Sequence, residues 1–451
     1  MSSVENIRRI EEIRKTKTER DTIIQNALAC RTLQDGKIVV KGESNLQQKV
    51  LNDAILSFEV MVAEGYEQRL DKICYSYPPS GSSPITDFSL IEVMKNLKGR
   101  RASTFAECME EVEIEYRRLE ELPLIRYDVY MVLNVVPFED FPALTLSMGD
   151  ATVQIRSTQE LRTVLSNEDV LAEKRKIEQK VGFRYSLDNR IFLTVSLQAR
   201  NAYYAGKIAM DLRDFVLALI DLSKHERSMP LLSSGPIGAI DSLNSTIGFI
   251  LDENNTYHDF FYQSENLDDV TISIDRDAVI EATDKYSRAS TDAQQIIQRA
   301  FSAYHRGITE KNPSFAFMYF WSSLEQILLK DENLRHPDML NRLYRVAINP
   351  NLLHKFEIGQ LLKLRNALIH DAAYHRVGPY HRSLLKLFTE PILWFFLYDI
   401  SDFNKGQLDL LYNKFGCHKN EFKRPRASDE EAAVYARIKK IRESAPLKVS
   451  N

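Results

Sequence analysis

A short run in the C-terminal half combines three residue types that can act on a phosphodiester. Between Leu361 and Asp371, an otherwise amphipathic stretch contains Arg365, Asn366 and His370. An arginine supplies a fixed positive fork for a phosphate, an asparagine both donates and accepts hydrogen bonds, and a histidine carries protons near neutral pH. Together these residues predict phosphodiester chemistry that needs neither a metal ion nor a cofactor.

The spacing of the three residues predicts a shared site on a helix. At about 100° per residue, Asn366 and His370 lie on one face, whereas Arg365 and His370 are about 140° apart. One helix therefore does not close the three into a compact site by itself. A second copy packed across a two-fold axis would place the same patch opposite itself and bring two arginines and two histidines together. We therefore expect a homodimer or a higher homo-oligomer.

A second pair with similar spacing, Arg376 and His381, follows a few residues later. Gly378 and Pro379 stand between the two, and this dipeptide makes a continuous helix there improbable. We interpret the pair as additional positive charge at most.

The motif Arg365-Asn366-x-x-x-His370 resembles the signature of the HEPN superfamily of helical RNases. The preceding run from Ser314 to Leu328, which includes Trp321 and Glu325, resembles the second helix of the Apea-like branch of that superfamily. The resemblance covers roughly residues 290–400. It implies a dimerising four-helix bundle that cleaves RNA without a metal, in antiviral defence against phage or as a toxin. Some relatives are inactive scaffolds, so the resemblance alone does not fix an activity.

Under this reading, His370 is the proton carrier, Arg365 stabilises charge on the phosphoryl oxygens and Asn366 positions a phosphate or His370. Glu325 could orient Arg365 through a charge-assisted hydrogen bond, although a helix-surface carboxylate is an equally good interpretation. Further RNA contacts are expected from the residues around the motif, namely Lys363, Tyr374, His375 and Arg376.

Two other interpretations stay open at this point. Arg365, Asn366 and His370 could form a polar cluster that holds helices in register, and the helical region would then be a catalytically silent dimerisation module. Its partner would be an N-terminal region that binds a ligand or a protein. Alternatively, another enzyme could modify this domain as the toxin of a toxin–antitoxin pair, with Tyr374 as the acceptor.

Composition indicates a soluble protein with more than one domain. The 451 residues are 44% hydrophobic and 27% charged, and the chain exceeds the usual size of a single core. The charged start and the absence of a long apolar run predict no signal peptide, no membrane span and a cytoplasmic location. The formal net charge of −4 means that any RNA contact must be local. Four scattered cysteines make a zinc site or a disulfide framework improbable.

The N-terminal half combines helical and strand patterns. Apolar spacing predicts helices at about 2–32, 46–72, 104–121 and 201–223. Alternating stretches rich in β-branched and aromatic residues predict strands at about 124–136, 143–146, 151–155, 190–199, 238–251 and 257–262. This combination is typical of an α+β fold with an antiparallel sheet.

From Arg276 onward the pattern is helical. Helices are predicted at about 277–309, 313–330, 355–370, 380–400 and 404–415, and a short charged helix is predicted after Ser428. The first four of these predict an all-α, HEPN-like bundle. We therefore divide the chain into an α+β sensor or regulatory domain (1–275), a helical RNase domain (276–402) and a charged helical tail (403–451). The sensor would respond to a phage or cellular trigger.

Overall fold

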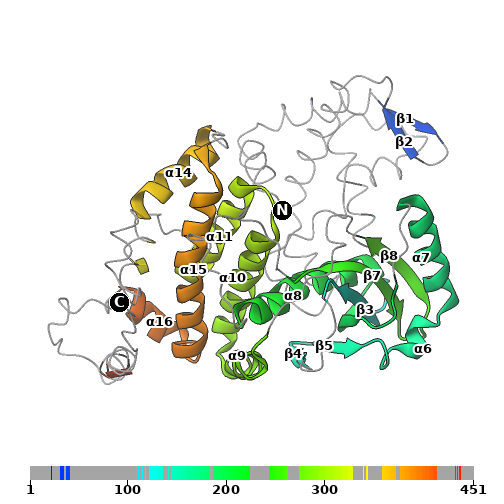
Figure 1. Ribbon diagram of the computed structural model, residues 1–451, viewed down its shortest axis with the longest axis horizontal. Coiled ribbons are helices and arrows are strands. Elements are labelled where there is room, and N and C mark those ends of the chain that lie inside the picture. The colour runs from blue at the N-terminus through cyan, green and yellow to red at the C-terminus, as the bar shows by residue number, and fades with distance from the viewer. Residues whose placement is uncertain are drawn as a thin grey trace.

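The structure is a computed structural model of the whole chain, shown as a ribbon in Figure 1. It describes residues 31–34, 37–40, 121–135, 144–181, 186–223, 243–262, 274–328, 358–371 and 376–413, and the single residues 22, 110, 114, 117, 141, 339, 342, 343, 432, 434, 436 and 437. The predicted helix at 46–72 and the predicted N-cap Ser428 lie outside the described residues.

The described part of the N-terminal half contains a six-stranded antiparallel sheet in the order β4-β5-β6-β3-β7-β8. Its strands are β3 (Ile125–Leu133), β4 (Thr145–Met148), β5 (Ala151–Ser157), β6 (Ile191–Ala199), β7 (Ser245–Asp252) and β8 (Tyr257–Tyr262). The predicted antiparallel sheet is thereby confirmed. A separate hairpin joins β1 (Arg31–Gln34) to β2 (Lys37–Val40), so the predicted helix at 2–32 is wrong at its last two residues.

Strand residues alternate between the two faces of the sheet, and both faces are apolar over much of their area. On one face, residues such as Val129 and Val195 join a large core with the helix α8 (Ala202–Leu222). On the other, Tyr130 stacks on Phe249 at 5.0 Å between ring centroids. That second face is packed by residues of α6 (Arg162–Leu165) and α7 (Glu168–Val181), which the sequence patterns did not predict.

Helix α8 belongs to both halves of the molecule. Figure 1 shows it running from the sheet to the helical part. Asn201 begins the helix, because its side chain accepts a hydrogen bond from the backbone N–H of Tyr204 at 3.0 Å. Nearly every residue from Tyr204 to Leu222 is buried, since one side faces the sheet and the other faces the helices that follow. A single hydrophobic core therefore extends across the boundary predicted at 275/276.

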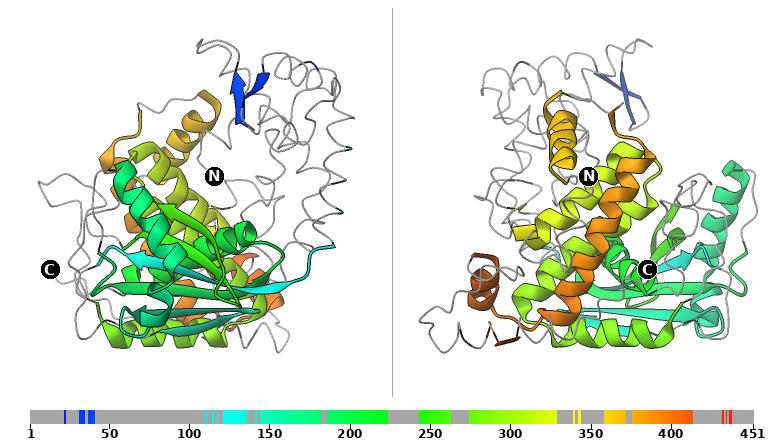
Figure 2. Two further views of the ribbon diagram at one scale, coloured as in Figure 1. Left: turned by 90° about the vertical axis from the view of Figure 1, so that its right-hand side faces the viewer. Right: turned by 60° about the vertical axis from the view of Figure 1, so that its left-hand side comes forward.

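The described C-terminal part is mostly helical. Its helices are α9 (Arg276–Arg288), α10 (Thr291–Thr309), α11 (Pro313–Leu328), α14 (Ile358–Asp371), α15 (Pro379–Asp399) and α16 (Lys405–Asn413). Helix α10 packs closely on α11, because Gly307 lies directly beneath the ring of Phe320, where a Cβ atom would approach to 2.7 Å. Helix α9 lies along the lower edge of the sheet and of the helical layer (Figure 2).

The predicted single helix at 277–309 is wrong, because the chain breaks it at Ala289 and Ser290. Ala289 has an extended backbone, and the Ser290 side chain accepts a hydrogen bond from the N–H of Ala293 at 3.2 Å, which starts α10 as a new helix. The break lets α9 turn away while α10 continues into the core. By contrast, Gly378 and Pro379 begin α15, as expected from their composition.

No described helix is both long and apolar enough to cross a membrane. Within the same described residues, no three His, Cys, Asp or Glu side chains lie close enough together to hold a metal ion.

Candidate functional site

The motif residues lie on α14, and the burial of this helix explains how Arg365 is oriented. Leu361 and Leu368 are almost fully buried, at 2% and 1% exposure. Arg365 follows Leu361 by four residues and precedes Leu368 by three, so it lies on the same face of the helix as the two leucines. Only 14% of its side chain is exposed. The buried face of the helix therefore contains a guanidinium between its two leucines.

A carboxylate oxygen and an amide oxygen accept hydrogen bonds from the two ends of this guanidinium. Nη2 of Arg365 donates to Oε1 of Glu325 on α11 at 3.2 Å, and Nη1 donates to Oδ1 of Asn366 at 3.4 Å. The third nitrogen, Nε, is buried and has no hydrogen-bond partner among the described residues. Burial lowers the pKa of Arg365, and the carboxylate of Glu325 opposes that shift. Nε is thus the one nitrogen of this guanidinium without an acceptor among the described residues.

Glu325 is itself held from within α11. Its Oε1 atom accepts a hydrogen bond from Nε1 of Trp321 at 2.8 Å. Trp321 is fully buried and stacks on Phe317 at 6.2 Å between ring centroids. The structure therefore brings Glu325, Arg365 and Asn366 together, and it adds Trp321, which was not among the predicted site residues.

The structure describes only some of the remaining predicted site residues. His370 lies in the last turn of α14, but its side chain is outside the described residues, as are Tyr374 and His375 entirely. Lys363 and Arg376 are exposed.

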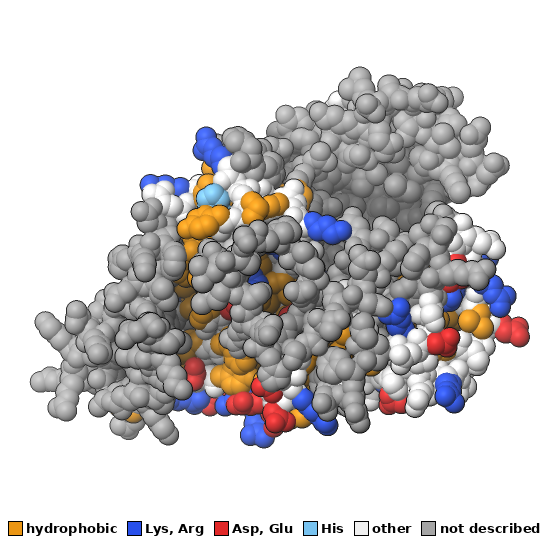
Figure 3. Space-filling model, viewed as in Figure 1, with side chains coloured by type: hydrophobic (Ala, Val, Ile, Leu, Met, Phe, Trp, Pro, Cys, Tyr) orange, Lys and Arg blue, Asp and Glu red, His pale blue; other side chains and the backbone are white. Residues whose placement is uncertain are grey.

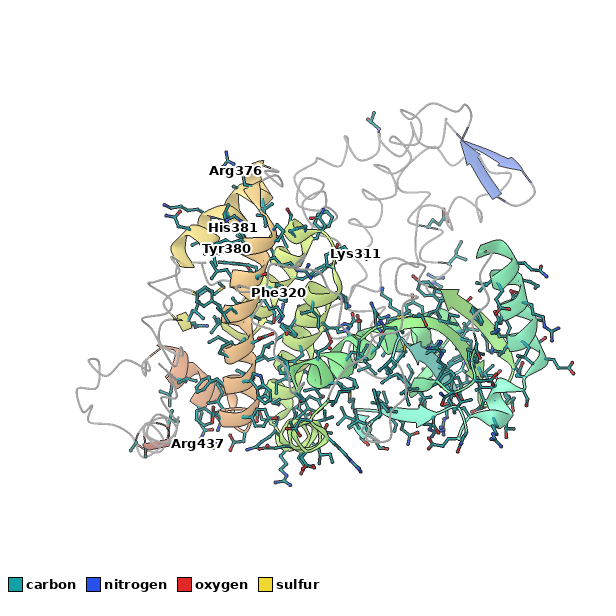
Figure 4. The ribbon with its side chains drawn as sticks, viewed as in Figure 1. Lys311, Phe320, Arg376, Tyr380, His381 and Arg437 are labelled. Carbon is teal, nitrogen blue, oxygen red and sulfur yellow. The ribbon has the colours of Figure 1, made fainter. Side chains whose placement is uncertain are left out.

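Figure 4 labels Arg376 with Tyr380 and His381 at the upper end of α15, beside α14. The surface at this end of the helical part carries basic side chains and a histidine among apolar ones (Figure 3). Burial lowers the pKa of His381, whose Nδ1 accepts a hydrogen bond from the N–H of Gly378 at 3.2 Å.

Two other basic residues near the motif in sequence already have partners within the fold. Arg382 is buried, and its Nη2 donates to the carbonyl oxygens of Gly307 at 3.1 Å and Ile308 at 3.0 Å, at the end of α10. Lys386 pairs with Glu390 one turn further along α15, at 2.7 Å.

The sequence patterns missed a second group of charges, buried between α8 and α10. Asp214 is 3% exposed. Its Oδ1 receives Nη2 of Arg213 at 2.6 Å and its Oδ2 receives Nε of Arg306 at 2.7 Å. Arg306 also pairs with Asp211 at 2.5 Å, and Nδ1 of His305 lies 3.4 Å from Oδ1 of Asp214. We call these five residues the α8–α10 network.

The network is electrostatically well compensated. Burial by itself would raise the pKa of Asp214, but the charges of Arg213 and Arg306 outweigh this effect and hold the pKa well below its ordinary value. Nε2 of His305 faces the carbonyl oxygen of Leu243 at 2.8 Å, and Nη1 of Arg213 donates to Ser245 at 2.8 Å. These contacts join the helical part to the chain entering β7. The signal in the sequence was the close spacing of Asp211, Arg213 and Asp214 within an otherwise largely apolar helix.

The two charged groups differ in what they can do chemically. The α8–α10 network lies within the core and connects parts of the fold. The cluster of Trp321, Glu325, Arg365 and Asn366 lies between α11 and the middle of α14, and the Nε of its arginine has no acceptor among the described residues.

Comparison of the chain with models of protein families, with curated proteins and with solved structures finds no match in any of the three. The function is therefore inferred from the residues and their geometry.

Proposed function

We propose that this protein is a metal-independent endoribonuclease of the HEPN type, with an active site completed between two copies of the chain. The observation that carries the proposal is the state of Arg365. It is anchored by Glu325 and Asn366, while its Nε keeps a donor without a partner among the described residues. An oriented guanidinium with a spare donor suits an anionic phosphoryl group.

We take α10, α11, α14 and α15 as the four helices of the HEPN bundle. In support of this, α11 packs against both α10 and α15 and is bonded to α14 through Glu325 and Arg365. The motif helix α14 is thus held to the helical part by its buried leucines, Leu361 and Leu368, and by the ion pair between Arg365 and Glu325.

In the proposed reaction, one His370 takes the proton of a ribose 2′-hydroxyl, and the 2′-oxygen attacks the adjacent phosphorus. The bond from phosphorus to the 5′-oxygen breaks, and His370 of the partner subunit gives a proton to that oxygen. Arg365 stabilises the negative charge that develops on the phosphoryl oxygens, and Asn366 positions the phosphate or His370. The products are a 2′,3′-cyclic phosphate and a 5′-hydroxyl, and DNA is not cleaved because it lacks the nucleophile.

Local positive charge would hold the RNA despite the formal net charge of −4. Lys363 and Arg376 are exposed on α14 and directly before α15, and we assign them, with Tyr374 and His375, to phosphate and base contacts. We assign the protein to the cytoplasm, where cleavage of cellular or phage RNA would serve antiviral defence or the action of a toxin. The α+β part would then sense a trigger.

A second candidate function rests on the pairing of Arg365 with Glu325. An arginine already paired with a carboxylate also suits a cluster that fixes the register of helices. In that case the helical part is a catalytically silent dimerisation module, coupled to an α+β part that binds a ligand or a protein.

The experiment that separates the two candidates compares wild type, His370→Ala and the matched control His258→Ala, which changes a histidine on β8. Each protein is incubated in EDTA with total RNA and with single-stranded DNA, and its oligomeric state is measured by light scattering. The nuclease predicts RNA fragments with 2′,3′-cyclic phosphate ends from wild type and the control only. Dimerisation should be equal in all three proteins.

The opposite results would decide against the nuclease. Cleavage of an all-deoxy substrate at the same rate excludes attack by a 2′-hydroxyl. If no RNA is cleaved, and neither induced expression nor phage infection reveals a phenotype that His370→Ala abolishes, the silent module is the better explanation.

A further inference from the structure

Three side chains from two helices form a continuous hydrogen-bonded chain beneath the motif. Trp321 and Glu325 are one turn apart on α11 and therefore lie on the same face of that helix. Both Nε1 of Trp321, at 2.8 Å, and Nη2 of Arg365, at 3.2 Å, donate to a single oxygen, Oε1 of Glu325. The indole on one helix is thus connected through one carboxylate oxygen to the guanidinium on the other.

The indole is the fixed end of this chain. Trp321 has no exposed surface, and the ring of Phe317 stacks on it, so its N–H group points in a constant direction. Glu325 is less constrained, since 25% of its side chain is exposed, and a glutamate with access to water can adopt other rotamers. A hydrogen bond to a carboxylate in a partly buried place is stronger than one between neutral groups. The indole therefore selects the rotamer in which Oε1 faces Arg365.

We propose that Trp321 is a positioning residue for Arg365, acting through Glu325. The indole N–H holds the carboxylate, and the carboxylate holds the Nη2 end of the guanidinium, so that the guanidinium keeps a single orientation. The consequence for cleavage rests on the proposed nuclease function. The hydrogen-bonded chain itself does not, and it can be tested without any enzymatic activity.

The sequence provides a matched control, because it contains two tryptophans. The other, Trp394, lies on α15 and stacks on Tyr398 at 4.5 Å between ring centroids. Trp394 is partly buried and packs against the same hydrophobic core as Trp321. A change from tryptophan to phenylalanine at either position keeps an aromatic ring and removes the indole N–H.

The first test observes the indole N–H groups directly by NMR of protein labelled with ¹⁵N-tryptophan. Wild type gives two indole signals, which Trp321→Phe and Trp394→Phe assign by removing one each. Glu325→Ala should shift the Trp321 signal, and Arg365→Ala should shift it less, while the Trp394 signal stays in place in both. If Glu325→Ala leaves the Trp321 signal unmoved, or moves both signals equally, the proposal is wrong.

The second test asks whether the indole acts on the reaction through Glu325. We expect Trp321→Phe to lower kcat by about tenfold, the effect of one hydrogen bond to a charged group, with little change in KM. Trp394→Phe should leave both constants unchanged. In a Glu325→Ala background, Trp321→Phe should cause no further loss.

An equal loss in both backgrounds would mean that Trp321 contributes only general packing, and the positioning role would be rejected. If the wild-type protein cleaves no RNA, the indole signals alone decide whether the hydrogen-bonded chain exists.

Discussion

Two arginine–carboxylate groups in this molecule are built differently, and the contrast separates a structural role from a candidate functional one. In the α8–α10 network, both oxygens of Asp214 receive an arginine, and Arg306 bridges Asp214 and Asp211. Beneath α14, one oxygen of Glu325 receives both Arg365 and Trp321, and the Nε of Arg365 has no partner among the described residues.

The pKa shifts follow the same division. In the network, opposite charges hold the pKa of Asp214 well below its ordinary value, and despite burial they raise the pKa of Arg306. At Arg365 burial dominates, and the pKa is lowered in spite of Glu325. A compensated group of charges is typical of a structural role, whereas an arginine with a nitrogen that lacks an acceptor is a candidate for binding an anion.

The largest expected effect comes from breaking the network. Asp214→Ala leaves the buried Arg213 and the partly exposed Arg306 without their shared carboxylate, so we expect the free energy of unfolding to fall by about 3–5 kcal/mol. Urea denaturation followed by circular dichroism measures this loss. The control is Asp284→Ala, whose exposed pair with Arg288 should contribute about 1 kcal/mol or less. Equal losses in both variants would contradict a structural role for the network.

The second effect, similar in size, should appear in the reaction instead of in stability. Arg365→Ala removes the group that stabilises the phosphoryl charge, and we expect kcat for RNA to fall by about 10²–10³-fold. Its unfolding free energy should fall by about 1 kcal/mol, since Glu325 can reach water. Arg288→Ala, on the exposed face of α9, is the control for loss of a positive charge. A large loss of stability with unchanged cleavage would reverse the contrast between the two groups.

The stabilising contribution of the network should be lost in acid and retained at neutral pH. The folded-state pKa of Asp214 is depressed, so its stabilising contribution is complete above the unfolded-state pKa, about 4, and is lost as the pH falls below that value toward the folded-state pKa. The difference in unfolding free energy between wild type and Asp214→Asn should therefore be constant from pH 7 to about pH 5 and shrink at lower pH. A difference that grows on acidification would exclude this assignment of charge.

The smallest effect is expected at the surface beside the motif. Lys363 is exposed on α14, so Lys363→Ala should change the unfolding free energy by less than about 0.5 kcal/mol. If Lys363 contacts a phosphate, the slope of log Kd for single-stranded RNA against log salt concentration should decrease in magnitude by about 0.7. Fluorescence anisotropy at several salt concentrations measures the slope, with Lys176→Ala on α7 as the control. An unchanged slope would remove Lys363 from the RNA contacts.

Local patterns were sufficient for most elements and for the motif helix. Alternation predicted β3 and β6 closely, and apolar spacing predicted α8 and placed Arg365, Asn366 and His370 on one helix. These predictions succeed because the side-chain period of a strand or helix is written into neighbouring residues. The break between α9 and α10 was missed, because an apolar period that continues through Ser290 conceals a cap.

The sequence by itself determined the types of most elements, the antiparallel character of the sheet and the spacing of the motif. Only the tertiary structure decided the strand order, the position of α8 between sheet and helices, and the partners of the charges. Arg365 meets Glu325 across 40 residues, and Arg306 meets Asp214 across 92. A charged residue carries no local sign of which distant partner it will face, because that choice is made when apolar surfaces pack and the enclosed charges must be compensated.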